Sequence, residues 1–238
     1  MAMTKSGRWQ VMLFWAAASL ATSRAYAADG DRLYTLDCGH ADFDNGAPLS
    51  DTGEYEGKAV SLADPCFLIR HPKGWLLWDA GLPSQTPASA AELDKLGVRM
   101  SPGPPLAGQL AQLGLRPAQV DYLSFSHLHF DHMGNANLFT ASTWILNRNE
   151  LAWAEAEPAH VSMTPQLFSG YRTAKTRMID GDLDVFGDGT VRILRAPGHT
   201  PGSQALLVKL ARSGPVLLLG DLYLSAENRR LELVPTAA

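Results

Sequence analysis

Three of the chain's seven histidines lie within six consecutive residues near its middle. Residues 127–132 read HLHFDH and directly follow an apolar run. Side chains alternate along an extended segment, so His127 and His129 point to the same side, and a turn into a helix brings Asp131 and His132 round beside them. Imidazole and carboxylate are the ligands that Zn²⁺ and similar first-row ions take. The stretch therefore predicts a metal site just beyond a buried strand.

Two later residues offer the same kinds of ligand. His199 lies in the loop PGHTPG, residues 197–202, where the glycines allow close backbone approach and the prolines stiffen the turn. Asp221 follows a second apolar run, residues 216–219, at a strand end, where loops collect functional groups. Each of the two is a weak signal alone, because an Asp after Gly is usually a turn residue.

The order of these residues is far more specific than any one of them. His199 comes 67 residues after His132, and Asp221 follows after a further 22. This order resembles the metallo-β-lactamase superfamily, which implies a four-layer αβ/βα sandwich of the α+β or α/β class and, at an intact site, two zinc ions. The resemblance implies these ligands: His127, His129 and His199 for one ion, Asp131 and His132 for the second, and Asp221 as a bridge.

Within that superfamily, the chain looks most like the N-acyl homoserine lactonases. The likeness spans about residues 32–235 and is carried by residues 67–74 followed by Leu82-Pro83, residues 126–135, and residues 221–223 with Glu227-Asn228. It implies a hydrolase that opens a small-molecule lactone ring by a metal-bound hydroxide.

Two residues then gain expected roles. Asp131 is expected to orient the hydroxide and shuttle a proton, as the catalytic residue. Asp79, in the turn of the stretch LWDAG, is expected to support a metal ligand rather than bind the metal. The alternative for Asp79 is a simple turn cap.

The chain departs from the family pattern after Asp221. The lactonases continue through a strand and a helix to a last metal-binding His, whereas 17 residues follow Asp221 here, none of them His. We therefore expect a fold that lacks the last strand and helix, and a weaker second metal position. Leu224 stands where lactonases have a Tyr or His near the substrate carbonyl, with Tyr223 displaced by one. The spare imidazoles, His40, His71 and His160, are not expected to replace the missing ligand.

Residues 1–27 have the build of a secretory signal peptide. A basic start with Lys5 and Arg8 precedes an apolar run, residues 11–21, and the triplet Ala25-Tyr26-Ala27 offers a cleavage site after Ala27. The apolar run is too short to span a bilayer comfortably, since a transmembrane helix needs about 20 residues. An uncleaved anchor or a buried helix is the alternative. We expect a secreted or periplasmic protein with no stable membrane anchor, its single hydrolase domain being residues 28–238.

Export would expose the two cysteines to an oxidising compartment. Cys38 and Cys66 are then expected to form a disulfide, the alternative being two small buried apolar side chains in neighbouring strands. The formal charge of −4 argues against a nucleic-acid partner, which a strongly basic surface would favour.

Apolar runs and turn signals predict a mixed fold in two strand-rich halves. Helices are expected after Pro105, ending near Gly114, and over residues 149–157, because apolar residues recur there at helical spacing. The expected strands are residues 32–36, 66–70, 76–79, 120–126, 143–147, 183–186, 191–195, 204–210 and 216–219.

Three functions remain open at this level. The first is an exported lactone hydrolase. The second is another hydrolase of the superfamily, acting on a β-lactam or a thioester. The third is a degenerate protein that binds metal without activity, which the missing His favours.

Overall fold

The structure, a computed structural model, describes residues 30–85, 88–156, 158, 160 and 162–235. The predicted signal peptide, residues 1–27, lies outside the described residues. Within the described part of the chain, no helix is long and apolar enough to cross a membrane.

Two β-sheets form the centre of the molecule. Sheet A has seven strands in the order β4-β1-β2-β3-β5-β6-β7, with parallel pairing from β3 through β7 and antiparallel pairing elsewhere. Its strands are β1 Arg32–Phe43, β2 Val60–His71, β3 Gly74–Trp78, β4 Val98–Ser101, β5 Tyr122–Ser124, β6 Thr143–Asn147 and β7 Lys175–Ile179. Sheet B is antiparallel, in the order β11-β10-β9-β8. Its strands are β8 Leu183–Asp184, β9 Val191–Arg195, β10 Gln204–Leu210 and β11 Gly214–Leu218.

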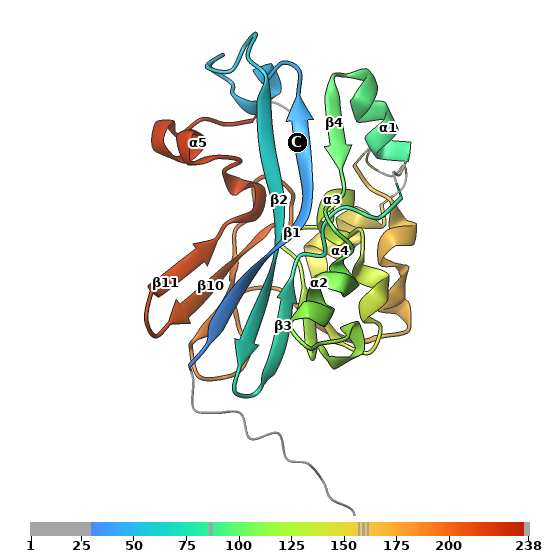
Figure 1. The fold of residues 1–238 in the computed structure, drawn as a ribbon, viewed down its shortest axis with the longest axis vertical. Helices are drawn as coiled ribbons and strands as arrows, with labels where there is room; N and C mark the ends of the chain where they lie inside the picture. The colour runs from blue at the N-terminus through green and yellow to red at the C-terminus, as the bar shows by residue number, and fades with distance from the viewer. Residues whose placement is uncertain (1–29, 86–87, 157, 159, 161, 236–238) are drawn as a thin grey trace, which may run out of the picture.

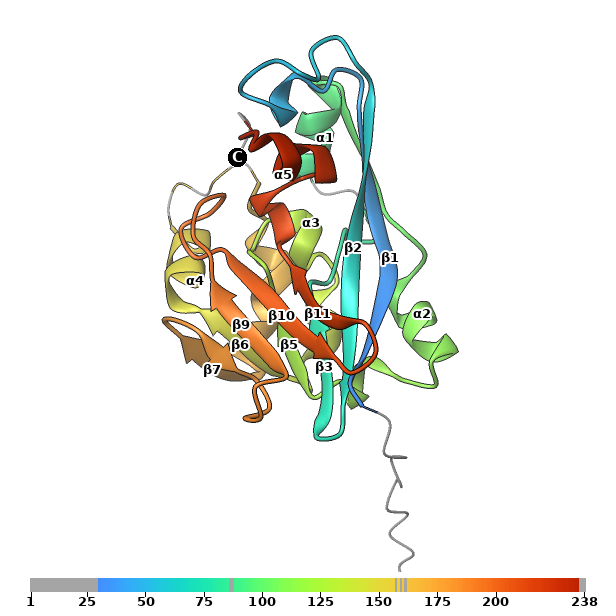
Figure 2. The ribbon, with the colours of Figure 1, turned by 90° about the vertical axis from the view of Figure 1, so that its left-hand side faces the viewer.

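Helices cover sheet A on the face turned away from sheet B. In Figure 1, α2, α3 and α4 lie on one side of sheet A, and β10 and β11 lie on the other. The α-helices are α1 Ala88–Lys95, α2 Leu106–Gln112, α3 Phe130–Met133, α4 Arg148–Ala154 and α5 Ala226–Leu231. The 3₁₀ helices are η1 Ala47–Leu49, η2 Pro117–Gln119, η3 Ala136–Phe139, η4 Pro165–Arg172 and η5 Gly220–Leu222. Figure 2 shows sheet B in front of β3, β5 and β6, with α5 at its upper end. The helices on sheet A and the two sheets are three layers of the expected four-layer sandwich.

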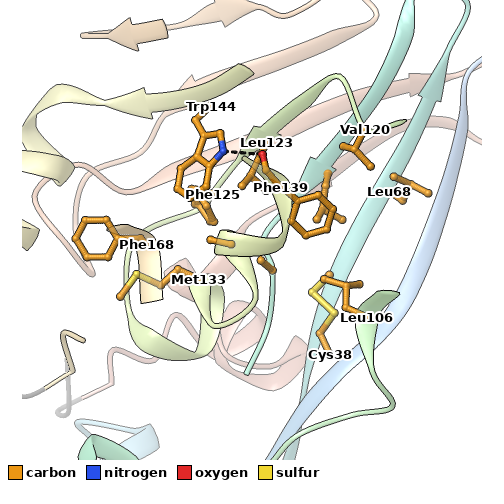
Figure 3. Packing of buried hydrophobic residues seen from close by; sticks show 14 of the residues in the cluster. Cys38, Leu68, Leu106, Val120, Leu123, Phe125, Met133, Phe139, Trp144 and Phe168 are labelled. Atoms are coloured by element: carbon orange, nitrogen blue, oxygen red, sulfur yellow. Dashed lines mark hydrogen bonds between the residues drawn. A yellow bond between two sulfur atoms is a disulfide. The ribbon is translucent and has the colours of Figure 1, made fainter. Parts of the chain in front are cut away.

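Two hydrophobic cores separate the layers. The core between the sheets contains Ile69 and Trp78 from sheet A and Ile193 and Leu206 from sheet B. The core between sheet A and the helices is shown in Figure 3, where the buried Trp144 donates its indole N–H to the carbonyl of Phe139 at 2.9 Å. This bond allows the indole ring of Trp144 to pack in the core without an unpaired donor.

Several predicted elements match the structure and others differ. β6, β9 and β10 have the predicted bounds, and α2 ends before Gly114 as expected. β1 and β2 are 12 residues each, much longer than predicted. Their outer halves carry no continuous apolar run and are strands because they pair with each other and because β1 also pairs with β4. β5 and β8 are shorter than predicted, and β3, β11 and α4 are each displaced by one or more residues. α1, β4, β7 and α5 were not predicted.

The C-terminal helix α5 is fastened to the connection between β1 and β2. Ser225 caps the helix by accepting a hydrogen bond from the Asn228 N–H at 3.0 Å. Asn228 is buried and donates to the Leu49 carbonyl at 2.7 Å, and the Tyr55 hydroxyl donates to Asn228 Oδ1 at 3.1 Å. Polar contacts therefore hold α5 beside the segment that joins β1 and β2 (Figure 1).

Candidate metal centre

Four segments end at one point and carry the predicted ligands there. His127 and His129 follow β5, and Asp131 and His132 lie in α3. His199 lies in the connection between β9 and β10, and Asp221 lies in η5 after β11. The structure therefore places five of the six predicted ligands in two overlapping groups of possible ligands. Asp131 lies beside them, with Oδ2 3.9 Å from His132 Nε2, but belongs to neither group among the described residues.

A glycine lets the segment carrying Asp221 approach the others. Gly220 has a φ of +55°, and a Cβ atom at this position would lie 2.5 Å from Cβ of Ser126. A side chain would therefore force apart η5 and the segment that carries His127. Gly220 serves close approach, which the sequence analysis did not single out.

The three-histidine group has the geometry of a metal site. His129 Nδ1 lies 3.0 Å from His127 Nε2 and 3.1 Å from His199 Nε2. Zinc with bonds of about 2.0–2.1 Å in a tetrahedral arrangement holds ligand atoms about 3.3 Å apart. The three rings stand nearly perpendicular to one another, with interplanar angles of 80°, 84° and 90°. Three nitrogens aimed at one point in this way fit a cation among them.

A second group of possible ligands shares one residue with the first. The ligand atoms of His127, His132 and Asp221 lie within 4.8 Å of one another. His132 Nε2 lies 3.4 Å from Asp221 Oδ1 and 3.9 Å from Asp131 Oδ2. His132 thus faces both predicted carboxylates.

Asp221 lies between the two groups. While its Oδ1 faces His132, its Oδ2 lies 3.5 Å from His199 Nε2 and 4.0 Å from His127 Nε2. One oxygen is therefore directed to each group. Asp221 can therefore offer an oxygen atom to a cation at either group.

Ser126 and Asp79 orient the ligands from behind. The Ser126 hydroxyl lies 3.0 Å from His127 Nδ1, so the Nε2 atom of that ring is left to face the site. Asp79 is buried, accepts the Ser126 N–H at 2.7 Å, and places Oδ2 3.3 Å from His132 Nδ1. Asp79 therefore contacts the predicted ligand His132 from behind and does not point to where a metal would lie. This is the position expected of a residue that supports a ligand.

The histidines of the two groups carry different charge in the metal-free protein. Burial lowers the pKa of His127 well below its usual value and, with the neighbouring His199, lowers the pKa of His129 to about 3. Burial also lowers the pKa of His199, so this group is neutral and ready to bind metal. Burial alone would lower the pKa of His132 too, but Asp221 and Asp131 raise it well above the usual value.

The carboxylates around His132 respond to the same charges. Burial would raise the pKa of Asp221, but His132 and His199 hold it down at about 2. Burial raises the pKa of Asp131, which His132 only partly offsets. In the metal-free protein, a protonated His132 thus supplies the positive charge that this acidic half requires.

Sequence reasoning missed Glu150, which ties two ligand-bearing segments together. This buried residue of α4 accepts the Leu128 N–H at 2.8 Å through Oε1. Its Oε2 accepts the Thr200 hydroxyl at 2.7 Å and the Gly202 N–H at 2.9 Å. One carboxylate therefore fixes the segments of His127–His129 and of His199 relative to each other. Its position in a predicted helix, in an exposed-looking polar sequence, gave no sign of this role.

We expect Glu150→Gln to lower both stability and metal affinity. The amide NH₂ would face a donor in one of the three contacts, and charged hydrogen bonds of this kind contribute about 1.5–3 kcal/mol each. Mutation of a residue that orients a metal ligand typically lowers the metal affinity about 10–100-fold. Denaturant unfolding and zinc competition would measure the two effects, with the exposed Glu92→Gln as control. Wild-type values for both in Glu150→Gln would show that this carboxylate does not hold the segments.

Asp64 is a second residue that the sequence analysis did not mark. It lies on β2, which packs against α3, and its Oδ2 is enclosed with no hydrogen-bond partner among the described residues. Burial raises the pKa of Asp64 well above its usual value, with His132 opposing and Asp131, Asp79 and Asp221 adding to the rise. Asp64 therefore favours the protonated form in the metal-free protein.

This raised pKa predicts a pH-dependent cost of folding. A carboxyl group with a higher pKa in the folded state than in the unfolded state stabilises the fold most below its unfolded pKa, which is about 3.9 for Asp. This contribution to the free energy of unfolding is lost as the pH rises toward the pKa of the folded state. The unfolding free energy of the metal-free Asp64→Asn variant should thus rise relative to that of wild type as pH increases above about 4, by at most about 1.4 kcal/mol per pH unit. Unfolding free energies from pH 4 to 7 measure this, with the exposed Asp94→Asn as control. Parallel curves for wild type and Asp64→Asn would contradict it.

The spare histidines occupy three different places. His71 is buried beside Phe186 and lies 2.8 Å from Asp188 Oδ2, and His40 is half exposed beside Asp37. His160 lies much nearer to the site, with its ring centre 6.1 Å from that of His129 and 5.4 Å from that of Trp153. It belongs to neither group of possible ligands among the described residues.

Comparison with known proteins identifies the family. A model described as the metallo-beta-lactamase superfamily matches residues 63–237. The chain belongs to the metallo-beta-lactamase superfamily. The matched region contains all six predicted ligands, and the fold expected for this superfamily is confirmed by structural neighbours as well as by the sheets described above.

The similar members of this superfamily are lactonases. The chain is 31% identical over 197 residues to the N-acyl homoserine lactonase AttM of Azorhizobium caulinodans, covering 75% of this chain and 72% of AttM. It is 29% identical to an N-acyl homoserine lactonase of Bacillus sp, covering 83% and 78%. The solved N-acyl homoserine lactone hydrolase with N-hexanoyl-L-homoserine at its catalytic metal centre superposes with a TM-score of 0.73 and 25% identity, covering 88% and 82%.

The residues present fit a divalent metal such as zinc. Neutral imidazoles and carboxylates are the donors zinc prefers, and they converge here on two overlapping groups. A dizinc lactonase, AidC, shares the fold with a TM-score of 0.59 and 17% identity, covering 79% of this chain and 70% of AidC.

Proposed function

We propose that the chain opens the ring of a small-molecule lactone, such as an N-acyl homoserine lactone, by metal-dependent hydrolysis. The observation that carries this proposal is Asp221, which directs one oxygen to the three-histidine group and the other to His132. Its support is the lactonase relatives, which belong to the same superfamily and cover most of the chain.

The reaction breaks the ring ester bond and adds water across it. A bound divalent metal supplies Lewis acidity and lowers the pKa of a water molecule to about 7. His127, His129 and His199 would hold one ion, and Asp131, His132 and Asp221 a second. Asp131 would orient the attacking water, take its proton on a carboxylate oxygen, and deliver a proton to the ring oxygen as it leaves. The products are one carboxylate and one alcohol on the same molecule.

We further propose that the two positions differ in affinity. The three-histidine group is neutral before metal binds, whereas metal at His132 must displace the proton that Asp221 and Asp131 favour. Zinc analysis after mild dialysis should therefore give nearer one equivalent than two. Two equivalents retained by the dialysed protein would contradict the difference.

A panel of three substrates tests the reaction class. Purified, zinc-loaded protein would be assayed with an N-acyl homoserine lactone, a β-lactam and a glutathione thioester under the same conditions. We expect the lactone to be hydrolysed with the highest kcat/KM, and Asp131→Asn to lose most of that rate. Preference for the β-lactam or the thioester would move the proposal to another hydrolase of the superfamily, and metal binding without any turnover would indicate a degenerate site.

We also propose that the protein is exported and cleaved after Ala27. The basic start, the short apolar run and the small residues before Ala28 support this, and so does the disulfide between Cys38 and Cys66, which suits an oxidising compartment. Expression of the full chain in a bacterium, followed by fractionation and N-terminal sequencing, tests it. The expected mature protein begins at Ala28 outside the cytoplasm, and an intact cytoplasmic chain would contradict the proposal.

A further inference from the structure

A buried disulfide joins the first two long strands of sheet A. Cys38 of β1 and Cys66 of β2 are bonded, with their Cα atoms 5.6 Å apart, and both are buried (Figure 3). The pairing of β1 with β2 shifts register between Asp37 and His40. Cys38 therefore lies in an irregular part of its strand, where the disulfide is the covalent constraint on its position.

Cys38 touches the turn that follows β3. Its carbonyl accepts the Leu82 N–H at 3.0 Å. A Cβ atom on Gly81, whose φ is +61°, would lie 2.3 Å from Cys38 Cβ, so only glycine allows this approach. The backbone of the turn is in direct contact with one end of the disulfide.

The same turn is bonded to the segment that carries His132. The Ala80 N–H donates to the His132 carbonyl at 2.7 Å, and the Gly134 N–H donates to the Gly81 carbonyl at 2.7 Å. The side chain of Asn135 adds donations to the carbonyls of Ala80 and Leu82. A displacement of the turn would therefore displace α3.

The turn also begins with the carboxylate that holds a metal ligand. Asp79 has a φ of +61°, which few residues other than glycine adopt, and its buried carboxylate contacts His132 Nδ1 and the Ser126 N–H. Such a backbone conformation persists only where the surroundings enforce it. Cys38 on one side and α3 on the other supply that enforcement.

We propose that the Cys38–Cys66 disulfide positions His132 for metal binding by holding Cys38 against the turn Asp79–Leu82. The proposal rests on the metal site of the proposed function but not on its substrate. Cys38 and Cys66 touch no ligand themselves and act through Asp79 and the backbone of α3. Among the described residues, the three-histidine group is linked to the turn only through His127, because Ser126, whose hydroxyl lies beside His127 Nδ1, donates its N–H to Asp79. His199 is instead held by the segment that Glu150 fixes.

The test compares loss of the disulfide with an ordinary loss of stability. The pair Cys38→Ala/Cys66→Ala removes the bond, and Ile69→Ala, on the other face of β2, destabilises the core between the sheets. Amide hydrogen exchange in the metal-free protein reports on Ser126 and Ala80, whose N–H groups bond the turn and α3. Zinc titration followed by the ring ¹⁵N resonances of His132 and His199 reports on the two positions separately.

We expect the disulfide variant to lose amide protection at Ser126 and Ala80 and to weaken zinc binding at His132 about 10-fold or more, with binding at His199 unchanged. Ile69→Ala should leave both affinities unchanged. Equal changes at the two positions, or no change at His132, would overturn the proposal and leave the disulfide a purely stabilising element.

A second variant decides the case if the disulfide variant does not fold. Gly81→Ala keeps the disulfide but pushes the turn away from Cys38, and it should weaken zinc binding at His132 selectively. Wild-type affinity at His132 in Gly81→Ala would overturn the proposal. Because every readout is metal binding or amide exchange, the result stands even if the protein hydrolyses no lactone, so failure of the substrate proposal is distinguishable.

Discussion

Replacing His199 with alanine is expected to release the more tightly held metal and to abolish lactone hydrolysis. Its Nε2 lies 3.1 Å from His129 Nδ1 and 3.5 Å from Asp221 Oδ2, so it faces both another histidine of its group and the carboxylate of Asp221. Mutation of a residue that only orients a ligand lowers the metal affinity about 10–100-fold. Removal of a ligand itself should lower the affinity by more than that. Metal content and kcat/KM measured on the same samples would give the effect.

The control for this variant is His40→Ala, because His40 is half exposed and pairs with Asp37 away from the site. It should retain metal and activity. His160→Ala is a stricter comparison, since its ring lies 6.1 Å from that of His129 yet belongs to neither ligand group. We expect His160→Ala to keep its metal and to change stability by no more than about 1 kcal/mol. Metal loss in His160→Ala, or full metal content in His199→Ala, would show that the ligands are assigned wrongly.

Asp221→Asn should have the second large effect, because it affects both positions at once. The amide keeps the size of the side chain but loses the charge that faces His132 through Oδ1 and His199 through Oδ2. We expect zinc binding to weaken at both positions and kcat/KM to fall by at least about 100-fold, as expected when fixed charges that stabilise a transition state are removed. Zinc titration and initial rates with a lactone are the measurements.

The matched control is Asp180→Asn, whose carboxylate is exposed and pairs with Arg148. It should match wild type in metal and rate. Weakening at only one position in Asp221→Asn would contradict a bridging role and assign Asp221 to that position alone.

The predicted ligands could be read from the sequence because their spacing is itself a consequence of the fold. His127 through His132 lie in one short segment after a strand, so local geometry alone indicates a ligand cluster there. His199 and Asp221 are weak signals alone and are predicted as ligands only through the order of residues that resembles the family. Glu150 and Asp64 could not be read in this way. Their roles depend on contacts between segments distant in sequence, such as the bond between Glu150 and Gly202, which no local pattern records.

The same distinction separates the predicted elements from the missed ones. β6 and β10 are mostly buried apolar runs, and β9 alternates buried apolar residues with less buried ones, so the sequence pattern is sufficient to define them. The outer halves of β1 and β2 carry no apolar run. They are strands because they pair with each other at four registered positions, His40 to Phe43 with Ala63 to Val60, and because β1 also pairs with β4 at the edge of the sheet. α5 has the polar sequence AENRRL and depends on Ser225 and on contacts with Tyr55 and Leu49. Tertiary contacts determine these elements.

The proposed function requires that lactone hydrolysis by this protein depend on metal bound at this site. The most direct test removes metal from the purified protein with a chelator, restores zinc stepwise, and follows both bound zinc and ring opening of an N-acyl homoserine lactone by mass spectrometry of the hydrolysed product. We expect no turnover without metal and a rate that returns in proportion to zinc bound at the histidine ligands, with no recovery in His199→Ala. A metal-free protein that opens the lactone as fast as the zinc-loaded one would contradict it.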